Sequence, residues 1–216
     1  MPGRGPVPIT PKKKKGEAIA VAVLLTSALV GTGGGLTAAT TSGGAVESVV
    51  AQSIQTRITS SSNAARRGQY REAWRRMGLR AISREIRREV QCAVHSYGQV
   101  QEFFLRTPCR SLQRTLLVIG DADGDTAVVS IAWVRMHNAS RAARLQQLVD
   151  TDGTGNISPI ASAVLEARGV QFTGEHSASR RIGSLVVIAE AAPDTGQPDA
   201  EVLDAAAQVA VVFPSP

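Results

Sequence analysis

Apolar residues recur at intervals of three and four from Ala64 to Val94, and arginines occupy most positions between them. This spacing places the apolar side chains on one face of a helix and the basic side chains on the other. We therefore predict a long basic amphipathic helix over residues 64–95. Its apolar face comprises Tyr70, Trp74, Met77, Ala81, Ile82, Ile86, Val90, Ala93 and Val94.

Two continuous apolar runs, residues 115–119 and 127–134, follow this segment and are rich in β-branched residues. The residues between them, 121–125, contain three aspartates and one glycine, which is typical of a turn. A β-hairpin is therefore predicted. Short helices are expected over residues 99–106, before the hairpin, and 139–149, after it, the second capped by Asn138.

A similar arrangement is expected in the last third of the chain. A short helix from Pro159 to Ala167 precedes two strand candidates, residues 170–174 and 185–189, with a polar turn at 179–183 and a final helix over 199–211. The fold class predicted is α+β. Two strand–strand–helix units form an antiparallel four-stranded sheet with helices on one face, over residues 96–213, and the basic helix precedes them.

The N-terminal part carries a different signal. Four lysines at residues 12–15 are followed by an uncharged apolar run, residues 18–30, which fits a signal peptide and is shorter than the roughly 20 residues of a membrane span. No charge appears between Ala18 and Val46, so an uncleaved anchor remains the alternative. We predict a signal peptide or single transmembrane anchor over residues 1–40, and a flexible spacer over 41–63.

This signal predicts an extracytoplasmic location for the rest of the chain. The protein is expected either to be secreted or to sit in the cell membrane as a single-pass protein with its N-terminus in the cytoplasm, because basic residues stay on that side. In the anchored form, residues 18–40 would anchor the chain in the membrane.

The net charge of +6 is unevenly distributed. Residues 57–91 contain ten arginines and three glutamates, whereas residues 92–216 contain nine arginines and thirteen acidic residues. The expected partner is an envelope protein or an anionic surface component, and no nucleic acid is expected after export. The candidate binding residues are Arg71, Trp74, Arg75, Arg80, Arg84 and Arg87. The alternative is a helix that only docks on the acidic domain and leaves its arginines in solvent.

The chain has two cysteines, Cys92 and Cys109. In an exported protein such a pair favours a disulfide, which we predict here. A zinc site is the alternative, because Cys92 and His95 have the C-x-x-H spacing and Cys109 follows.

Residues 150–158 match the first nine positions of an EF-hand calcium loop. The oxygen ligands would come from Asp150, Asp152, Thr154, Asn156 and Ser158. The bidentate glutamate that closes such a site is replaced by Ala161, so a plain glycine-rich turn explains the same residues. A calcium-binding module is an alternative function, and no cofactor is predicted.

Familiar catalytic motifs are absent from the sequence: it has no G-x-S-x-G, no H-E-x-x-H and no phosphate-binding G-x-x-x-x-G-K. We therefore predict that the protein is not an enzyme. An enzyme of unrecognised type, with His95 or His176 in its site, is the alternative.

Three segments, residues 96–112, 129–134 and 152–159, resemble the recurring core of uncharacterised actinobacterial exported or membrane-anchored proteins of unknown function. The resemblance implies a folded module and transfers no activity. The function expected is therefore that of a non-catalytic binding or interaction module of the cell envelope.

Overall fold

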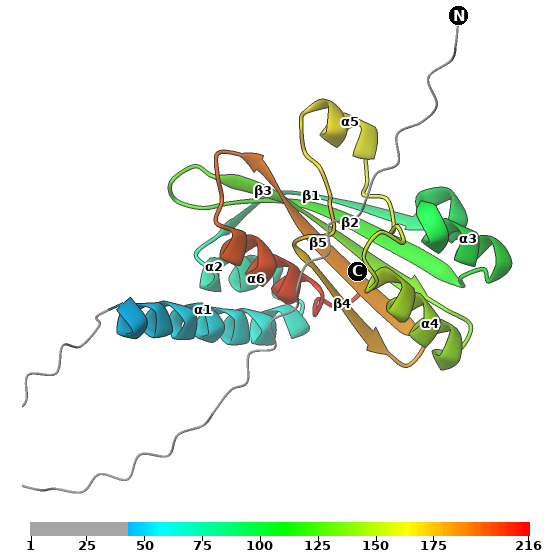
Figure 1. Cartoon of the computed structure of the whole chain (residues 1–216), viewed down its shortest axis with the longest axis horizontal. Coiled ribbons are helices and arrows are strands. Elements are labelled where there is room, and N and C mark those ends of the chain that lie inside the picture. Colours follow the sequence, from blue (N-terminus) through cyan, green and yellow to red (C-terminus); the bar gives the residue numbers. More distant parts are fainter. Residues whose placement is uncertain (1–42) are drawn as a thin grey trace, which may run out of the picture. The chain divides into compact units, whose positions relative to one another are not determined.

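Five antiparallel strands form one sheet in the order β1-β2-β3-β5-β4. The structure, a computed structural model, describes residues 43–216, with side chains from residue 52 onward. Figure 1 shows the sheet with its helices. The elements are α1 (Gly43–Arg66), α2 (Tyr70–Arg76), β1 (Arg80–Glu89), η1 (Cys92–His95), α3 (Gly98–Arg106), β2 (Ser111–Gly120), β3 (Thr126–Arg135), α4 (Ala139–Val149), α5 (Ser162–Ala167), β4 (Ser177–Ile182), β5 (Leu185–Thr195) and α6 (Ala200–Ala210).

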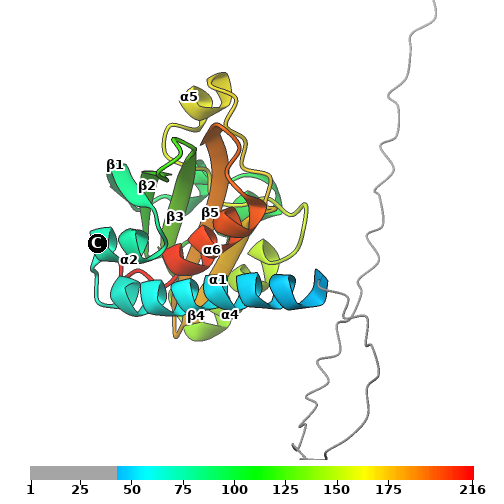
Figure 2. The same cartoon turned by 90° about the vertical axis from the view of Figure 1, so that its left-hand side faces the viewer.

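The α+β class and the antiparallel sheet are confirmed, but helices cover both faces of the sheet rather than one. Figure 2 shows α1, α2 and α6 in front of the strands, with α5 above them and α4 partly hidden at the bottom of the view. The central strands are apolar on both sides: Val129 and Ile131 face one core, and Val128 and Val134 face the other. A strand that is apolar on both faces needs a cover on each.

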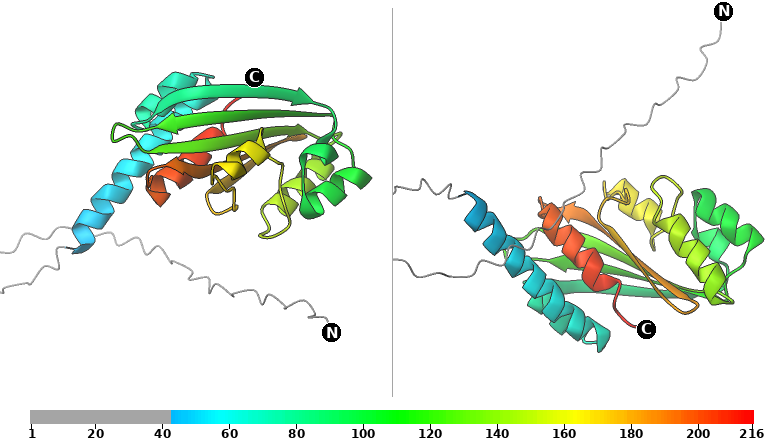
Figure 3. Two further views of the ribbon diagram at one scale, coloured as in Figure 1. Left: turned by 90° about the horizontal axis from the view of Figure 1, so that it is seen from above. Right: turned by 60° about the horizontal axis from the view of Figure 1, so that its bottom comes forward.

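We call the two sides the α6 face and the α4 face. On the α6 face, α1, α2 and α6 pack on the odd-numbered residues of β3 and β5, around Trp74, Trp133 and Phe213. On the α4 face, α3, α4 and the two cysteines pack on Leu112, and Leu165 of α5 packs on Val128. In the right-hand view of Figure 3, α6 lies along the sheet next to α1, and α4 lies near the other end of the sheet next to α3.

The predicted first hairpin is confirmed: Gly120 pairs with Thr126 across the turn at residues 121–125. The two helices expected on either side of it are present as α3 and α4, and the expected final helix is present as α6. The Asn138 side chain accepts the backbone N–H of Arg141 at the start of α4. The short helix expected from Pro159 begins at Ser162.

The single helix predicted over residues 64–95 is wrong. Residues 64–76 are divided between the end of α1 and the separate helix α2, with a break at Gly68, and α2 ends at Arg76. The chain turns at Gly78, whose φ of 80° is a left-handed value, and residues 80–89 form β1, a fifth strand. Ile82, Ile86 and Val90 are four residues apart, and a spacing of four fits the period of two of a strand as well as that of a helix. The hydrogen-bonded pairing of β1 with β2 selects the strand over the helix.

Two further expectations are corrected. Residues 170–174 are not a strand, and the segment predicted as the second turn forms β4, which is joined to β5 by a hairpin at Gly183 and Ser184. Residues 43–63, expected to be a flexible spacer, belong to α1. That helix is held by tertiary packing, because Ile54, Ile58 and Ala65 pack into the α6-face core.

The signal peptide or anchor predicted over residues 1–40 lies outside the described residues. Within residues 43–216, every helix is either too short or too polar to cross a membrane.

Candidate functional site

The most exposed element of the sheet is its edge strand β1. It pairs with β2 alone, and no residue of β1 is buried. The left-hand view of Figure 3 shows β1 as the outermost strand, with α1 and α2 beside only one of its ends, where α2 packs against it. Edge strands present unpaired backbone N–H and C=O groups and can accept a further strand.

Arginines line this strand and the neighbouring helix α2. We define the β1 edge surface as Arg71 and Arg75 of α2 together with Arg80, Arg84, Arg87 and Arg88 of β1, all of them exposed. The predicted surface residues are thus brought together with one exception. Trp74 is fully buried in the α6-face core, with its ring 5.7 Å from that of Phe213, so its prediction as a surface-binding residue is wrong.

The arginines of this surface differ in how far their charge is neutralised. Arg75 and Arg76 share one carboxylate, that of Glu72, and their hydrogen bonds lower the pKa of Glu72 to about 2. Arg87 pairs with Glu85. In the described part of the chain, the guanidinium groups of Arg71, Arg80 and Arg88 contact no acidic or aromatic partner.

Arg84 is held in place by an aromatic stack. Its guanidinium carbon lies 3.9 Å from the centroid of the Tyr70 ring, which stacks in turn on Phe213 at 4.3 Å. The Tyr70 hydroxyl donates to the carbonyl of Pro214. The cation is therefore oriented by the core without losing its charge to a carboxylate.

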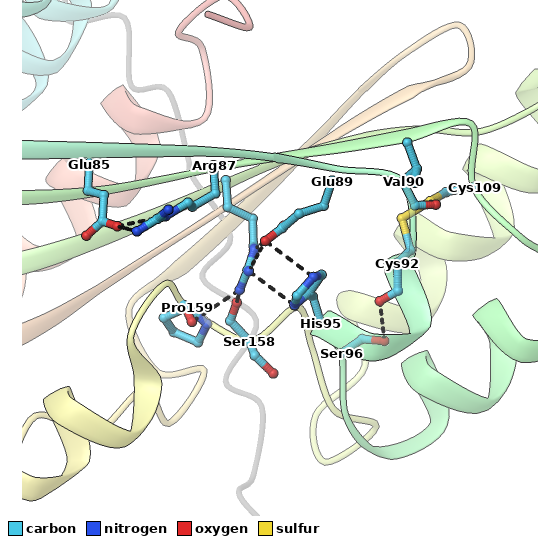
Figure 4. A network of polar contacts seen from close by, with 11 residues as sticks. Glu85, Arg87, Glu89, Val90, Cys92, His95, Ser96, Cys109, Ser158 and Pro159 are labelled. Atoms are coloured by element: carbon cyan, nitrogen blue, oxygen red, sulfur yellow. Dashed lines mark hydrogen bonds and ion pairs between the residues drawn. A yellow bond between two sulfur atoms is a disulfide. The ribbon is translucent and has the colours of Figure 1, made fainter.

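The end of β1 is locked by a buried ion network centred on Arg114. The side chain of Arg114 is 9% exposed and donates to both carboxylate oxygens of Glu89, from Nε at 2.8 Å, and to the carbonyls of Ser158 and Pro159. Figure 4 shows Glu89, His95, Ser158 and Pro159 gathered around this guanidinium. The network connects β1, η1, β2 and the loop before α5.

The protonation state of His95 follows from its neighbours. Because a guanidinium can only donate, the contact of 3.2 Å between Arg114 and His95 Nδ1 makes Nδ1 the acceptor. The ring proton then sits on Nε2, which faces the Glu89 carboxylate at 3.3 Å. Burial and the charge of Arg114 lower the pKa of His95, in keeping with a neutral ring, although the charge of Glu89 opposes them.

A disulfide joins Cys92 to Cys109 and closes the connection from β1 to β2, as predicted. Because both thiols are oxidised, the alternative of a zinc site at Cys92, His95 and Cys109 is wrong. The bridge and the Arg114 network hold the same end of the edge strand.

The predicted calcium loop is packed against residues 95–98. The Thr154 hydroxyl lies 2.6 Å from the carbonyl of Leu148, and Asn156 Oδ1 accepts the N–H of Ile157. Ser158 contributes its carbonyl to Arg114, whereas Asp150 and Asp152 point to solvent. Within residues 43–216 no three His, Cys, Asp or Glu side chains gather as a metal site would require. Calcium binding stays the alternative function of this loop and not the expected one.

Sequence reasoning missed Glu190, a carboxylate in β5 that is only 6% exposed. It accepts the backbone N–H of Gly174 and a hydrogen bond from Asn156. Burial raises the pKa of Glu190, although these hydrogen bonds and the charge of His176 oppose the shift. The available signal was a lone acidic residue in an apolar strand, but the predicted strand stopped one residue earlier.

His176 lies near this carboxylate and pairs with Asp204, with 2.9 Å between Nδ1 and Oδ1. The adjacent Ser177 hydroxyl donates to the carbonyl of Gly174 rather than to the imidazole. The three side chains therefore do not form the relay that a serine nucleophile needs.

Comparisons with known proteins assign no role to these residues. No protein-family model matches the chain, and no curated protein or solved structure matches it significantly.

Proposed function

We propose that this chain is an exported or single-pass membrane-anchored protein of the cell envelope whose folded domain is a non-catalytic binding module. Its ligand is an anionic partner, which it binds through the β1 edge surface. The observation that carries the proposal is the exposed edge strand with unneutralised arginines on and beside it, Arg71, Arg80 and Arg88.

The charge distribution supports an anionic partner. Arg84 is oriented by the Tyr70 ring without a carboxylate partner, and Arg88 lies on the same side of β1, also without one. A concentration of like charge on one surface attracts an opposite charge, and the attraction weakens as salt is added.

The compartment is supported by the disulfide. Disulfides form and persist in oxidising environments outside the cytoplasm, so the Cys92–Cys109 bridge agrees with export. The lysine-rich start of the chain and the apolar run behind it provide the corresponding export signal. The resemblance to actinobacterial envelope proteins remains a prediction.

A non-catalytic role is supported by the state of the titratable groups in the described residues. His95 is bound on both ring nitrogens by Arg114 and Glu89, and His176 is paired with Asp204 beside a serine whose proton is engaged elsewhere. These groups hold elements of the fold together.

The test is a binding measurement on the full-length chain, with poly-L-glutamate as the immobilised anionic probe. The double variant Arg80→Glu/Arg88→Glu reverses two free charges of the surface, and Arg141→Glu/Arg144→Glu reverses two exposed charges on α4 as the matched control. The lysines at residues 12–15 are present in all three proteins, so a difference reports the β1 edge surface.

We expect the parent and the control to bind the probe. Their affinity for it should fall steeply between 50 and 200 mM salt, because binding neutralises about two or more charges of the surface. The double variant is expected to bind at least about tenfold more weakly. Equal binding by the double variant, or no binding by the parent, overturns the proposal.

A further inference from the structure

Resting on the proposed function, we propose that the anionic partner is an extended acidic segment of another protein, which binds as a sixth strand beside β1. The recognition would combine backbone hydrogen bonds along the free edge with side-chain contacts of fixed spacing.

The backbone of β1 is suited to accept a strand. Pairing with β2 is regular from Ser83, opposite Val118, to Glu89, opposite Leu112, and the only register shift lies before it, between Ala81 and Ser83. The other edge strand, β4, is shorter, and both α4 and α6 pack against it. Edges that are not used for binding are commonly short, bulged, covered or charged. Of these devices most of β1 carries only the charge, which repels a basic strand and selects an acidic one.

The strand is also held rigidly from its inner side. Glu89 is fixed by Arg114, and the disulfide from Cys92 to Cys109 follows within three residues. A preformed edge loses little conformational entropy when a partner pairs with it.

The side chains of β1 specify what the added strand should carry. Cross-strand partners share a face, so Arg84, Ile86 and Arg88 point to the α6 face with Leu117, Thr115 and Gln113. Ile86 remains 39% exposed between the two cations. A complementary strand therefore has an acidic residue, an apolar residue and an acidic residue at alternate positions.

On the opposite side of β1, the added strand should carry neutral residues. There Glu85 and Arg87 neutralise one another, with 2.6 Å between their charged atoms. The recognition pattern is accordingly acidic–neutral–apolar–neutral–acidic, as in Glu-Thr-Val-Thr-Glu.

Other occupants of this edge fit less well. In a second copy paired antiparallel about Ile86, Arg84 of one chain would lie opposite Arg88 of the other, and like charges directly opposite are unfavourable. Residues 1–42 of this chain carry five basic residues and one acidic residue, so they are repelled as well. An anionic lipid surface would satisfy the arginines but not the backbone edge.

The experiment measures the binding of a fluorescein-labelled peptide, Thr-Glu-Thr-Val-Thr-Glu-Thr, to the full-length chain by fluorescence anisotropy. A peptide of the same sequence with alternate backbone nitrogens methylated is the matched control, because methylation removes hydrogen-bond donors and leaves every side chain in place. A second control has the same composition with the two glutamates adjacent.

Strand addition predicts that both controls bind at least about tenfold more weakly than the parent peptide. Arg88→Glu in the protein should weaken the parent peptide by a similar factor. Replacing one of the two peptide glutamates by lysine should then restore binding, and the position that does so gives the strand orientation.

Equal binding of the methylated peptide overturns the inference and leaves the proposed function, because charge alone would explain the affinity. The same holds if the chain binds poly-L-glutamate or phosphatidylglycerol vesicles but not the peptide. If none of these three probes binds, the proposed function and the inference fail together.

Discussion

The substitution Arg114→Met tests how the edge strand is fixed. Methionine keeps much of the aliphatic length of arginine and removes every hydrogen bond of its guanidinium. Glu89, whose side chain is 19% exposed, then loses its counter-charge, and the carbonyls of Ser158 and Pro159 lose their donor.

The expected cost is about 3–5 kcal/mol, because removing one partner of a buried ion pair leaves the other charge without compensation. With a urea m-value of about 2 kcal/mol/M, the unfolding midpoint should fall by about 2 M. Removing both charges, in Arg114→Met/Glu89→Met, should recover most of the loss, since no buried charge is then left unpaired.

Urea unfolding of the full-length, disulfide-bonded chain can be followed by the fluorescence of its two buried tryptophans, Trp74 and Trp133. A cost below about 1 kcal/mol for Arg114→Met, or a double variant as unstable as the single one, would refute the reasoning.

The same network gives a pH dependence. Burial alone would raise the pKa of Glu89, but the hydrogen bond and charge of Arg114, with smaller effects of His95 and Arg87, lower it. The pKa of His95 is lowered as well. Both groups therefore contribute stability that is present above their unfolded pKa values and lost as the pH falls through the folded ones. This loss begins below about pH 6.5 for His95 and below about pH 4.5 for Glu89. In Arg114→Met it should become shallower, because the charge that contributes to lowering both pKa values is gone.

Three further outcomes are expected. Replacing Cys92 and Cys109 by serine should lower stability by about 3 kcal/mol, measured by urea unfolding, and an unchanged midpoint would contradict it. Because the folded pKa of Glu190 is raised, the stability of the parent should fall relative to Glu190→Gln as the pH rises from the unfolded pKa through the folded one, and parallel stability curves would argue against this. Millimolar calcium should leave the melting temperature unchanged, because oxygens of residues 150–158 are already hydrogen-bonded within the fold; a rise would show that the loop binds the ion.

The sequence predicts those elements whose pattern is local. The hairpin around residues 121–125 and the helix capped by Asn138 depend on neighbouring residues and were found as expected. The disulfide followed from the count of cysteines and the predicted compartment.

The misplaced elements depend on distant partners. Ile82 and Ile86 fit a helix and a strand equally well, and only the pairing with β2 selects the strand. In α1, Ile54, Ile58 and Ala65 follow a helical period that is weak in the sequence. The helix is stabilised when these residues pack into the α6-face core.

The candidate site was predicted in composition but not in geometry. The arginines do share a surface, but they lie on a strand edge and a short helix rather than along one helix. Trp74 illustrates the difference: an aromatic residue on the apolar face of a helix can serve a binding surface or a core, and packing against Phe213 buries it. Arg114 and Glu89 are 25 residues apart, beyond the reach of any local pattern.

The aromatic stack on the α6 face also sets an order of events in folding. Tyr70 bonds to Pro214 across 144 residues, and the Trp133 indole N–H donates to the carbonyl of Phe213 across 80. The core beneath α1 and α2, which are synthesised early, is therefore completed only by residues synthesised late. Such long-range closure makes folding slow. A chain that cannot close this core early stays unfolded for longer during synthesis, which is compatible with the proposed export of the domain.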